Sequence, residues 1–122
     1  MATAVLSGDK ESIRVKLLVD TGASQTFLPH RIARKLKLDL IPTSHYTEVA
    51  GGTMKIHVGR VKISLADPNP EGRVGQAHVL NPVMIVDDAA IPFPVLGRRP
   101  FLRWYKLTVS EVDREITLVE TA

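Results

Sequence analysis

An aspartate at the end of an apolar strand is the residue of this 122-residue chain with the clearest potential for chemistry. The apolar residues 17–19 lead into Asp20-Thr21-Gly22, so a carboxylate is followed by a hydroxyl and a glycine. The hydroxyl can hold a tight turn together, and the glycine lets the backbone approach a ligand closely. An aspartate after a strand is also a common turn former, because its side chain bonds to the backbone two residues on. The triplet alone therefore leaves a structural turn and a reactive carboxylate open as alternatives.

The Asp-Thr-Gly triplet occurs once in the chain. Peptide hydrolysis by carboxylates needs two acids a few ångströms apart with a water molecule between them. Like charges at that distance do not both ionise, so the pair shares one proton. The ionised acid then takes a proton from the water, while the protonated acid polarises the scissile carbonyl. If Asp20 is catalytic, the second acid must come from another copy of the chain.

A second motif lies far downstream and strengthens the catalytic interpretation. Residues 13–28 read Ile-Arg-Val-Lys-Leu-Leu-Val-Asp-Thr-Gly-Ala-Ser-Gln-Thr-Phe-Leu, and Val95-Leu96-Gly97-Arg98 follows much later. Together they resemble the retropepsin-like aspartic proteases, in which an apolar strand and Asp-Thr/Ser-Gly-Ala precede two apolar residues and a glycine. The resemblance extends from about Ser12 to Val109. It implies one mainly β domain over residues 1–122, a closed β-sandwich or barrel with one or two short helices.

The resemblance also implies an activity and a set of site residues. It implies an aspartic endopeptidase that acts as an obligate homodimer on extended polypeptides and needs no metal or organic cofactor. The glycine-rich hairpin tip near residue 51 resembles the flap that closes over substrate in this family. The implied catalytic residues are Asp20, Thr21 and Gly22, and the implied substrate-binding residues are Ala23, Ser24, Ala50, Gly51 and Gly52.

The sequence departs from the family pattern at two places. Ser24 stands where some retroviral members carry an acid that pairs with an arginine, so Arg98 lacks that carboxylate, and a bracing role and a plain surface arginine remain open. The chain also continues past Gly97 into a hairpin that retroviral members do not have. This leaves open whether interleaved terminal strands build the dimer.

Periodicity predicts the secondary structure that would position these residues. Alternating apolar residues predict strands over 3–7 and 13–19, and Pro29 suits the first position of a helix ending by Leu38. Residues 44–65 predict two long strands around a glycine turn, with a bulge at Gly59-Arg60 where the alternation slips phase. The remaining expected elements are two strand-like runs within 74–86 separated by Asn81-Pro82, a short helix around 100–105, and a terminal hairpin over 106–119.

Composition argues against several other classes of function. The chain has no cysteine and no apolar run long enough to span a membrane, and its N-terminus lacks the basic region of a signal peptide. A cytoplasmic protein with no membrane partner is therefore expected. The four histidines have no metal-ligand spacing, so no metal site is predicted. The net charge of +3 and pI near 9.5 come from dispersed basic residues, so no nucleic-acid partner is expected.

Two other function classes compete with the protease. One is a non-catalytic dimerisation or peptide-binding module of the same fold, although such a module would have no need of Asp20. The other is a nucleic-acid-binding β-barrel, which has only the high pI in its favour.

Overall fold

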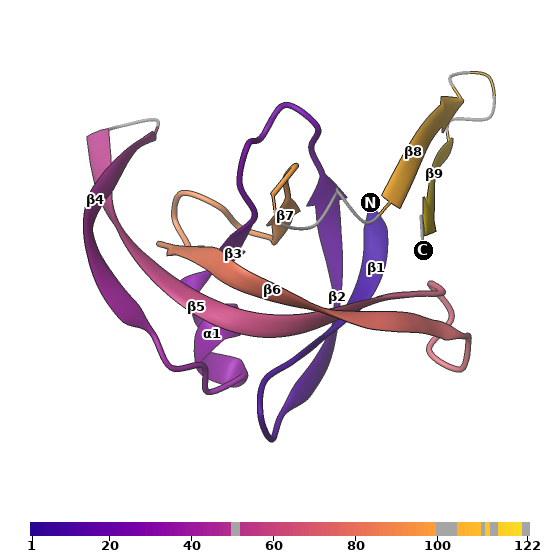
Figure 1. Ribbon diagram of the computed structural model, residues 1–122, viewed down its shortest axis with the longest axis horizontal. Helices are drawn as coiled ribbons and strands as arrows, with labels where there is room; N and C mark the ends of the chain where they lie inside the picture. The colour runs from indigo at the N-terminus through magenta and orange to yellow at the C-terminus, as the bar shows by residue number, and fades with distance from the viewer. Residues whose placement is uncertain (50–51, 100–104, 111, 113–114, 121–122) are drawn as a thin grey trace.

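The computed structural model describes residues 1–49, 52–99, 105–110, 112 and 115–120, and most of them lie in β-strands (Figure 1). One helix is present among them, α1 (His30–Lys35). The strands are β1 (Ala2–Ser7), β2 (Ser12–Val19), β3 (Phe27–Pro29), β4 (Ile41–Val49), β5 (Gly52–Ala66), β6 (Val74–Val86), β7 (Val95–Leu96), β8 (Tyr105–Ser110) and β9 (Glu115–Glu120). In the described residues, no helix is long and apolar enough to cross a membrane.

Pairing of the first strand with two others closes the sheet into a barrel. The strands lie in the order β1-β2-β7-β3-β6-β5-β4, and β1 also pairs antiparallel with β5. Six strands therefore form a closed ring, and β4 extends the sheet outward from β5. Each strand of the ring therefore has a partner on both sides over at least part of its length. The predicted mainly β closed fold is confirmed.

Strand β5 is long enough to take part in two structures. Its first half pairs with β4 in a hairpin that extends beyond the barrel, on the left of Figure 1, and its second half pairs with β6 and β1. Residues 52–58 therefore form one arm of the predicted flap hairpin, and residues 57–66 form a wall of the barrel. The hairpin tip, residues 50–51, lies outside the described residues.

The predicted irregularity in β5 is found, but its partner strand differs from the prediction. Gly59 pairs with Val83 and Val61 with Leu80, so one extra residue is accommodated on β6 at Asn81-Pro82, whose peptide bond is cis. The prediction of two runs in 74–86 was wrong, because β6 continues through this point as one strand. A proline has no N–H to donate to the ladder, and a bulge is where a strand tolerates it.

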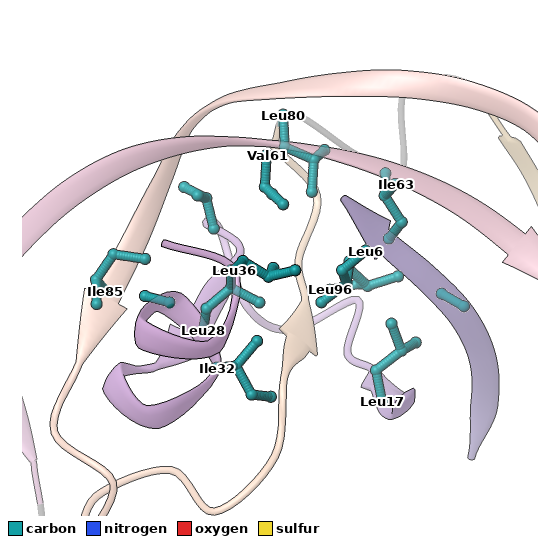
Figure 2. Close-up of a cluster of buried hydrophobic side chains, with 13 residues drawn as sticks. Leu6, Leu17, Leu28, Ile32, Leu36, Val61, Ile63, Leu80, Ile85 and Leu96 are labelled. Atoms are coloured by element: carbon teal, nitrogen blue, oxygen red, sulfur yellow. The ribbon is translucent and has the colours of Figure 1, made fainter. Parts of the chain in front are cut away.

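Alternating side chains of β2 show how the core is built. Arg14 and Lys16 are exposed, whereas Leu17 is completely buried. Leucine, isoleucine and valine side chains from the strands and from α1 meet inside the barrel (Figure 2). The largest of them that are fully buried are Leu6, Leu17, Leu28, Leu36, Ile63, Leu80, Ile85 and Leu96.

The helix α1 begins one residue later than predicted and ends before Leu38, as predicted. Pro29 ends β3 and occupies the N-cap position, with extended backbone at ψ 146°, instead of the first helical position. At the other end Lys37 adopts a φ of 53°, and the N–H of Leu38 donates to the carbonyl of Ala33 at 3.1 Å. A left-handed residue just past the C-cap is a common way to end a helix. The helix therefore ends at Lys35, within the predicted limit of Leu38.

A carboxylate from a distant loop caps α1. The proline N-cap offers no side-chain acceptor, and the backbone N–H of Arg31 donates instead to Oδ1 of Asp88 at 2.8 Å. The guanidinium of Arg34 lies 3.6 Å from Oδ2 of the same carboxylate, and that of Arg31 donates to the carbonyl of Pro92. These contacts tie the helix to the loop that leads into β7.

The C-terminal part of the chain forms the predicted hairpin. Strands β8 and β9 pair only with each other in the described structure, and Leu118 packs against the core of the barrel. Of the short helix predicted around residues 100–105, residues 100–104 lie outside the described residues. Tyr105 already belongs to β8, so the predicted end of that helix is wrong.

Removal of the cap on α1 tests its contribution to stability. We expect Asp88→Ala to lower the free energy of unfolding by about 1–2 kcal/mol, because the N–H of Arg31 loses a charged acceptor. Urea unfolding at a fixed protein concentration measures the change. Glu71→Ala is the matched control, since it removes the same charge from an exposed loop residue. Equal unfolding midpoints for the two variants would show that Asp88 does not cap the helix.

Candidate active site

Three backbone and side-chain bonds fix Asp20 in a tight turn at the end of β2. Its N–H donates to the carbonyl of Leu96 at 2.9 Å, and its own carbonyl accepts from the N–H of Ala23 at 3.2 Å. Its Oδ1 accepts from the N–H of Gly22 at 2.9 Å. The turn-forming role that the sequence suggested is therefore real. It occupies one carboxylate oxygen, and no donor contacts Oδ2 within the described part of the chain.

The downstream apolar motif is what supports this turn. The two-residue strand β7 lies between β2 and β3, parallel to β2 and antiparallel to β3. Leu18 and Val19 pair with Val95 and Leu96, and the N–H of Leu18 donates to the carbonyl of Pro94 at 2.9 Å. The two motifs that are far apart in the sequence are therefore hydrogen-bonded neighbours.

Gly97 permits the closest backbone approach in the site. A Cβ atom at this position would lie 1.9 Å from the carbonyl oxygen of Gln25 and 2.8 Å from that of Ala23. Both atoms belong to the backbone and cannot rotate away. Just after the glycine, the N–H groups of Arg98 and Arg99 donate to the carbonyls of Ala23 and Ser24 at 2.9 and 3.1 Å. No residue with a side chain fits at position 97 without separating these two segments.

Thr26 is a positioning residue that the sequence analysis did not identify. Its side chain is almost fully buried, and its Oγ1 donates to the carbonyl of Arg99 at 3.0 Å and accepts from the N–H of Gly97 at 3.2 Å. Its backbone carbonyl accepts from the N–H of Met84 at 2.9 Å. The hydroxyl thus joins the chain leaving the Asp20 turn to the chain leaving β7. The only sequence signal was a small hydroxyl residue directly before an apolar stretch.

The other predicted catalytic and binding residues fall into two groups. Thr21, Gly22 and Ser24 are exposed and Ala23 is partly buried, all in the turn that carries Asp20. Gly52 begins β5 opposite Val49, at the end of the β4–β5 hairpin that stands apart from the turn in Figure 1. Ala50 and Gly51 lie outside the described residues. The structure therefore brings residues 20–24 together with 97–99, and it places the predicted flap on a separate hairpin.

No other described cluster offers comparable chemistry. Within residues 1–49 and 52–99, and in the described parts of the C-terminal hairpin, no three histidine or acidic side chains could hold a metal ion. His30 and His57 meet edge to face with ring centroids 6.4 Å apart, and in the described structure neither ring pairs with a carboxylate. A groove of about 330 Å³ between the β1–β2 turn and the middle of β5 contains Asp9 and Asp39, but lysine and arginine side chains line it as well. Asp20 remains the candidate for catalysis.

Comparison with known proteins agrees with this geometry. Residues 3–98 match the model of a protein family described as aspartyl protease. Among solved structures, a retropepsin-like aspartic protease from Rickettsia conorii is similar, with 20% sequence identity and a TM-score of 0.58. The match covers 96% of this chain and 88% of that one, and it confirms the predicted retropepsin-like fold. No curated protein matches the sequence.

A pair of glycine substitutions tests the support beneath the turn. We expect Gly97→Ala to lower the free energy of unfolding by at least about 3 kcal/mol, because its Cβ would overlap the Gln25 carbonyl. Gly22→Ala should cost less than about 1 kcal/mol, since its Cβ would meet only Oδ1 of Asp20, at 3.2 Å. Urea unfolding of both variants measures the difference. A Gly97→Ala protein as stable as the parent would contradict the described packing.

The hydroxyl of Thr26 can be tested by a matched pair. Thr26→Val keeps the shape but removes the hydroxyl, leaving the N–H of Gly97 and the carbonyl of Arg99 without this partner. We expect a loss of about 1–3 kcal/mol in the free energy of unfolding. Thr26→Ser keeps the hydroxyl and should lose no more than about 1 kcal/mol for one buried methyl group. If Thr26→Val and Thr26→Ser lower the free energy of unfolding equally, the hydroxyl does not join the two segments.

Proposed function

Because this chain belongs to the aspartyl protease family, we propose that it is an aspartic endopeptidase that hydrolyses peptide bonds of extended polypeptides. The observation that supports the proposal most directly is the placement of Asp20. Its carboxylate is partly exposed at the end of a barrel strand, in a turn fixed by Leu96 and Gly22. A rigid support of this kind is what a catalytic group needs.

The proposed active site forms between two copies of the chain. Each chain has one Asp-Thr-Gly triplet, so a pair of such carboxylates requires a homodimer about a twofold axis. In this assembly the exposed Thr21 hydroxyl would brace one turn against its symmetry mate, and Gly22 would let the two turns approach closely. The barrel itself is closed within one chain, so association would supply the site without being needed to complete the barrel.

The proposed reaction uses the two Asp20 carboxylates in different protonation states. The ionised carboxylate accepts a proton from a water molecule as the water oxygen bonds to the scissile carbonyl carbon. The protonated carboxylic acid gives its proton to the carbonyl oxygen, so a neutral tetrahedral diol forms. The C–N bond then breaks, one diol hydroxyl loses its proton to a carboxylate, and the leaving nitrogen gains one. The pair ends with a single shared proton, as it began.

The proposed substrate lies extended between the paired turns and the β4–β5 hairpin. Contacts with Ala23 and Ser24 and main-chain hydrogen bonds to the hairpin tip (Ala50, Gly51, Gly52) would hold it in place. The base of the hairpin is irregular: Pro42 pairs with His57 and Tyr46 with Lys55, so β4 has two extra residues there. A bulge is a place where a strand bends. This feature supports a hairpin that can close over substrate as a flap.

Replacement of the carboxylate by its amide isostere tests the proposed function. The parent should cleave members of a diverse peptide library, and mass spectrometry detects the cleavage products. Asp20→Asn should lower the cleavage rate by about 10²–10⁴-fold, because the amide accepts no proton from water. Asp9→Asn is the matched control, since it makes the same change on an exposed residue outside the turn.

Unfolding midpoints of the two variants show whether either one has lost its fold. Cleavage by Asp20→Asn at the parental rate would assign the chemistry to another group. Binding of peptides by both proteins, with no cleavage by the parent, would make the chain a peptide-binding module instead of an enzyme.

A further inference from the structure

Two neighbouring arginines line a hollow beside the turn that carries Asp20. The hollow has a volume of about 370 Å³, and its walls are Ser24, Gln25, Arg98 and Arg99. The backbone of both arginines is bonded to the carbonyls of Ala23 and Ser24, and Arg99 forms a parallel bridge with Gln25. The hollow is thus built on the same two segments that support Asp20.

The guanidinium groups of these two arginines have no acidic partner in the described structure. Arg14 donates to the carbonyls of Asp67 and Pro70, and Arg34 pairs with the carboxylate of Asp88. The exposed Arg60 and Arg73 also have no acidic partner in the described structure, but neither lines this hollow. Arg98 and Arg99 are exposed and take part in neither of the two described ion pairs. Two adjacent cations in one hollow favour an anionic ligand, and the planar guanidinium fork fits a carboxylate.

We infer that Arg98 and Arg99, with Ser24 and Gln25, form a subsite for an acidic side chain of the substrate peptide. This inference rests on the proposed function and adds to it a substrate class, peptides with aspartate or glutamate near the scissile bond. The Ser24 hydroxyl and the Gln25 amide are further donors to a carboxylate.

The distance from Asp20 limits where in the substrate the acidic residue lies. Ser24 is four residues after Asp20, so their Cα atoms are at most about 14 Å apart. An extended peptide advances about 3.3 Å per residue, so a residue within four positions of the scissile bond reaches the hollow. A twofold dimer has one hollow at each end of its cleft. Acidic residues are therefore favoured on both sides of the cleaved bond.

A matched pair of peptides tests the subsite by turnover. The library peptides that are cleaved identify the position, relative to the scissile bond, at which acidic residues are preferred. Two peptides are then made that differ only at this position, with glutamate in one and glutamine in the other. The parent should show a kcat/KM about tenfold higher for the glutamate peptide. The ratio should fall toward one in Arg98→Gln, in Arg99→Gln and in the double variant. Arg73→Gln, which removes the same charge from the exposed β5–β6 loop, should keep the parental ratio.

A binding measurement separates this inference from the proposed function. Fluorescence anisotropy of the same two peptides on Asp20→Asn needs no turnover, and the glutamate peptide should bind about tenfold more tightly. Equal affinities and equal kcat/KM values would overturn the subsite while leaving the protease intact. Tighter binding of the glutamate peptide without cleavage by the parent would support the subsite and contradict the protease.

The dimer is the other possible source of a carboxylate for these arginines. Sedimentation of the double variant distinguishes a subunit contact from a substrate subsite, because loss of a substrate subsite leaves the dimer dissociation constant unchanged. A weakened dimer, with an unchanged ratio of kcat/KM between the glutamate and glutamine peptides, would assign the arginines to the subunit contact and overturn the inference.

Discussion

The contact between Gly97 and the backbone of Gln25 is the constraint on which the rest of the site depends. At this point two chain segments are closer than any side chain allows. Their closeness lets β7 insert between β2 and β3, and β7 provides the Leu96 carbonyl that holds the N–H of Asp20. The buried hydroxyl of Thr26 joins the same segments from the inside. The position of the carboxylate is therefore a consequence of how the barrel closes.

The fold separates what makes the barrel stable from what the proposed chemistry needs. A continuous ring of strands and a leucine-rich core stabilise each chain by itself. The Asp20 turn, by contrast, is exposed or partly buried along residues 20–24 and provides a single carboxylate. In the proposed enzyme the second carboxylate comes from the other subunit. Subunit association would then control activity with little effect on the fold of each chain.

Much of this fold could be predicted from the sequence, because long strands have a clear alternation of apolar residues. The bend near Gly59 was predicted for this reason, and the turn at Asp20 was predicted from its Asp-Thr-Gly triplet. Strands β3 and β7 have too few residues to show a period, and only their pairing identifies them. The exact last residue of α1 depends on the left-handed backbone of Lys37, and the role of Thr26 depends on partners distant in the sequence. Such features arise from tertiary contacts that local sequence patterns do not encode.

Subunit mixing tests whether each active site contains an Asp20 from both subunits. The parent and Asp20→Asn are combined at a constant total concentration, with time for subunits to exchange, and peptide cleavage is measured against the parental fraction. We expect activity to follow the square of this fraction, about one quarter at an equal mixture, because only dimers of two parental chains carry both carboxylates. Activity proportional to the parental fraction would show that one chain is sufficient for cleavage and would rule out an active site shared between subunits.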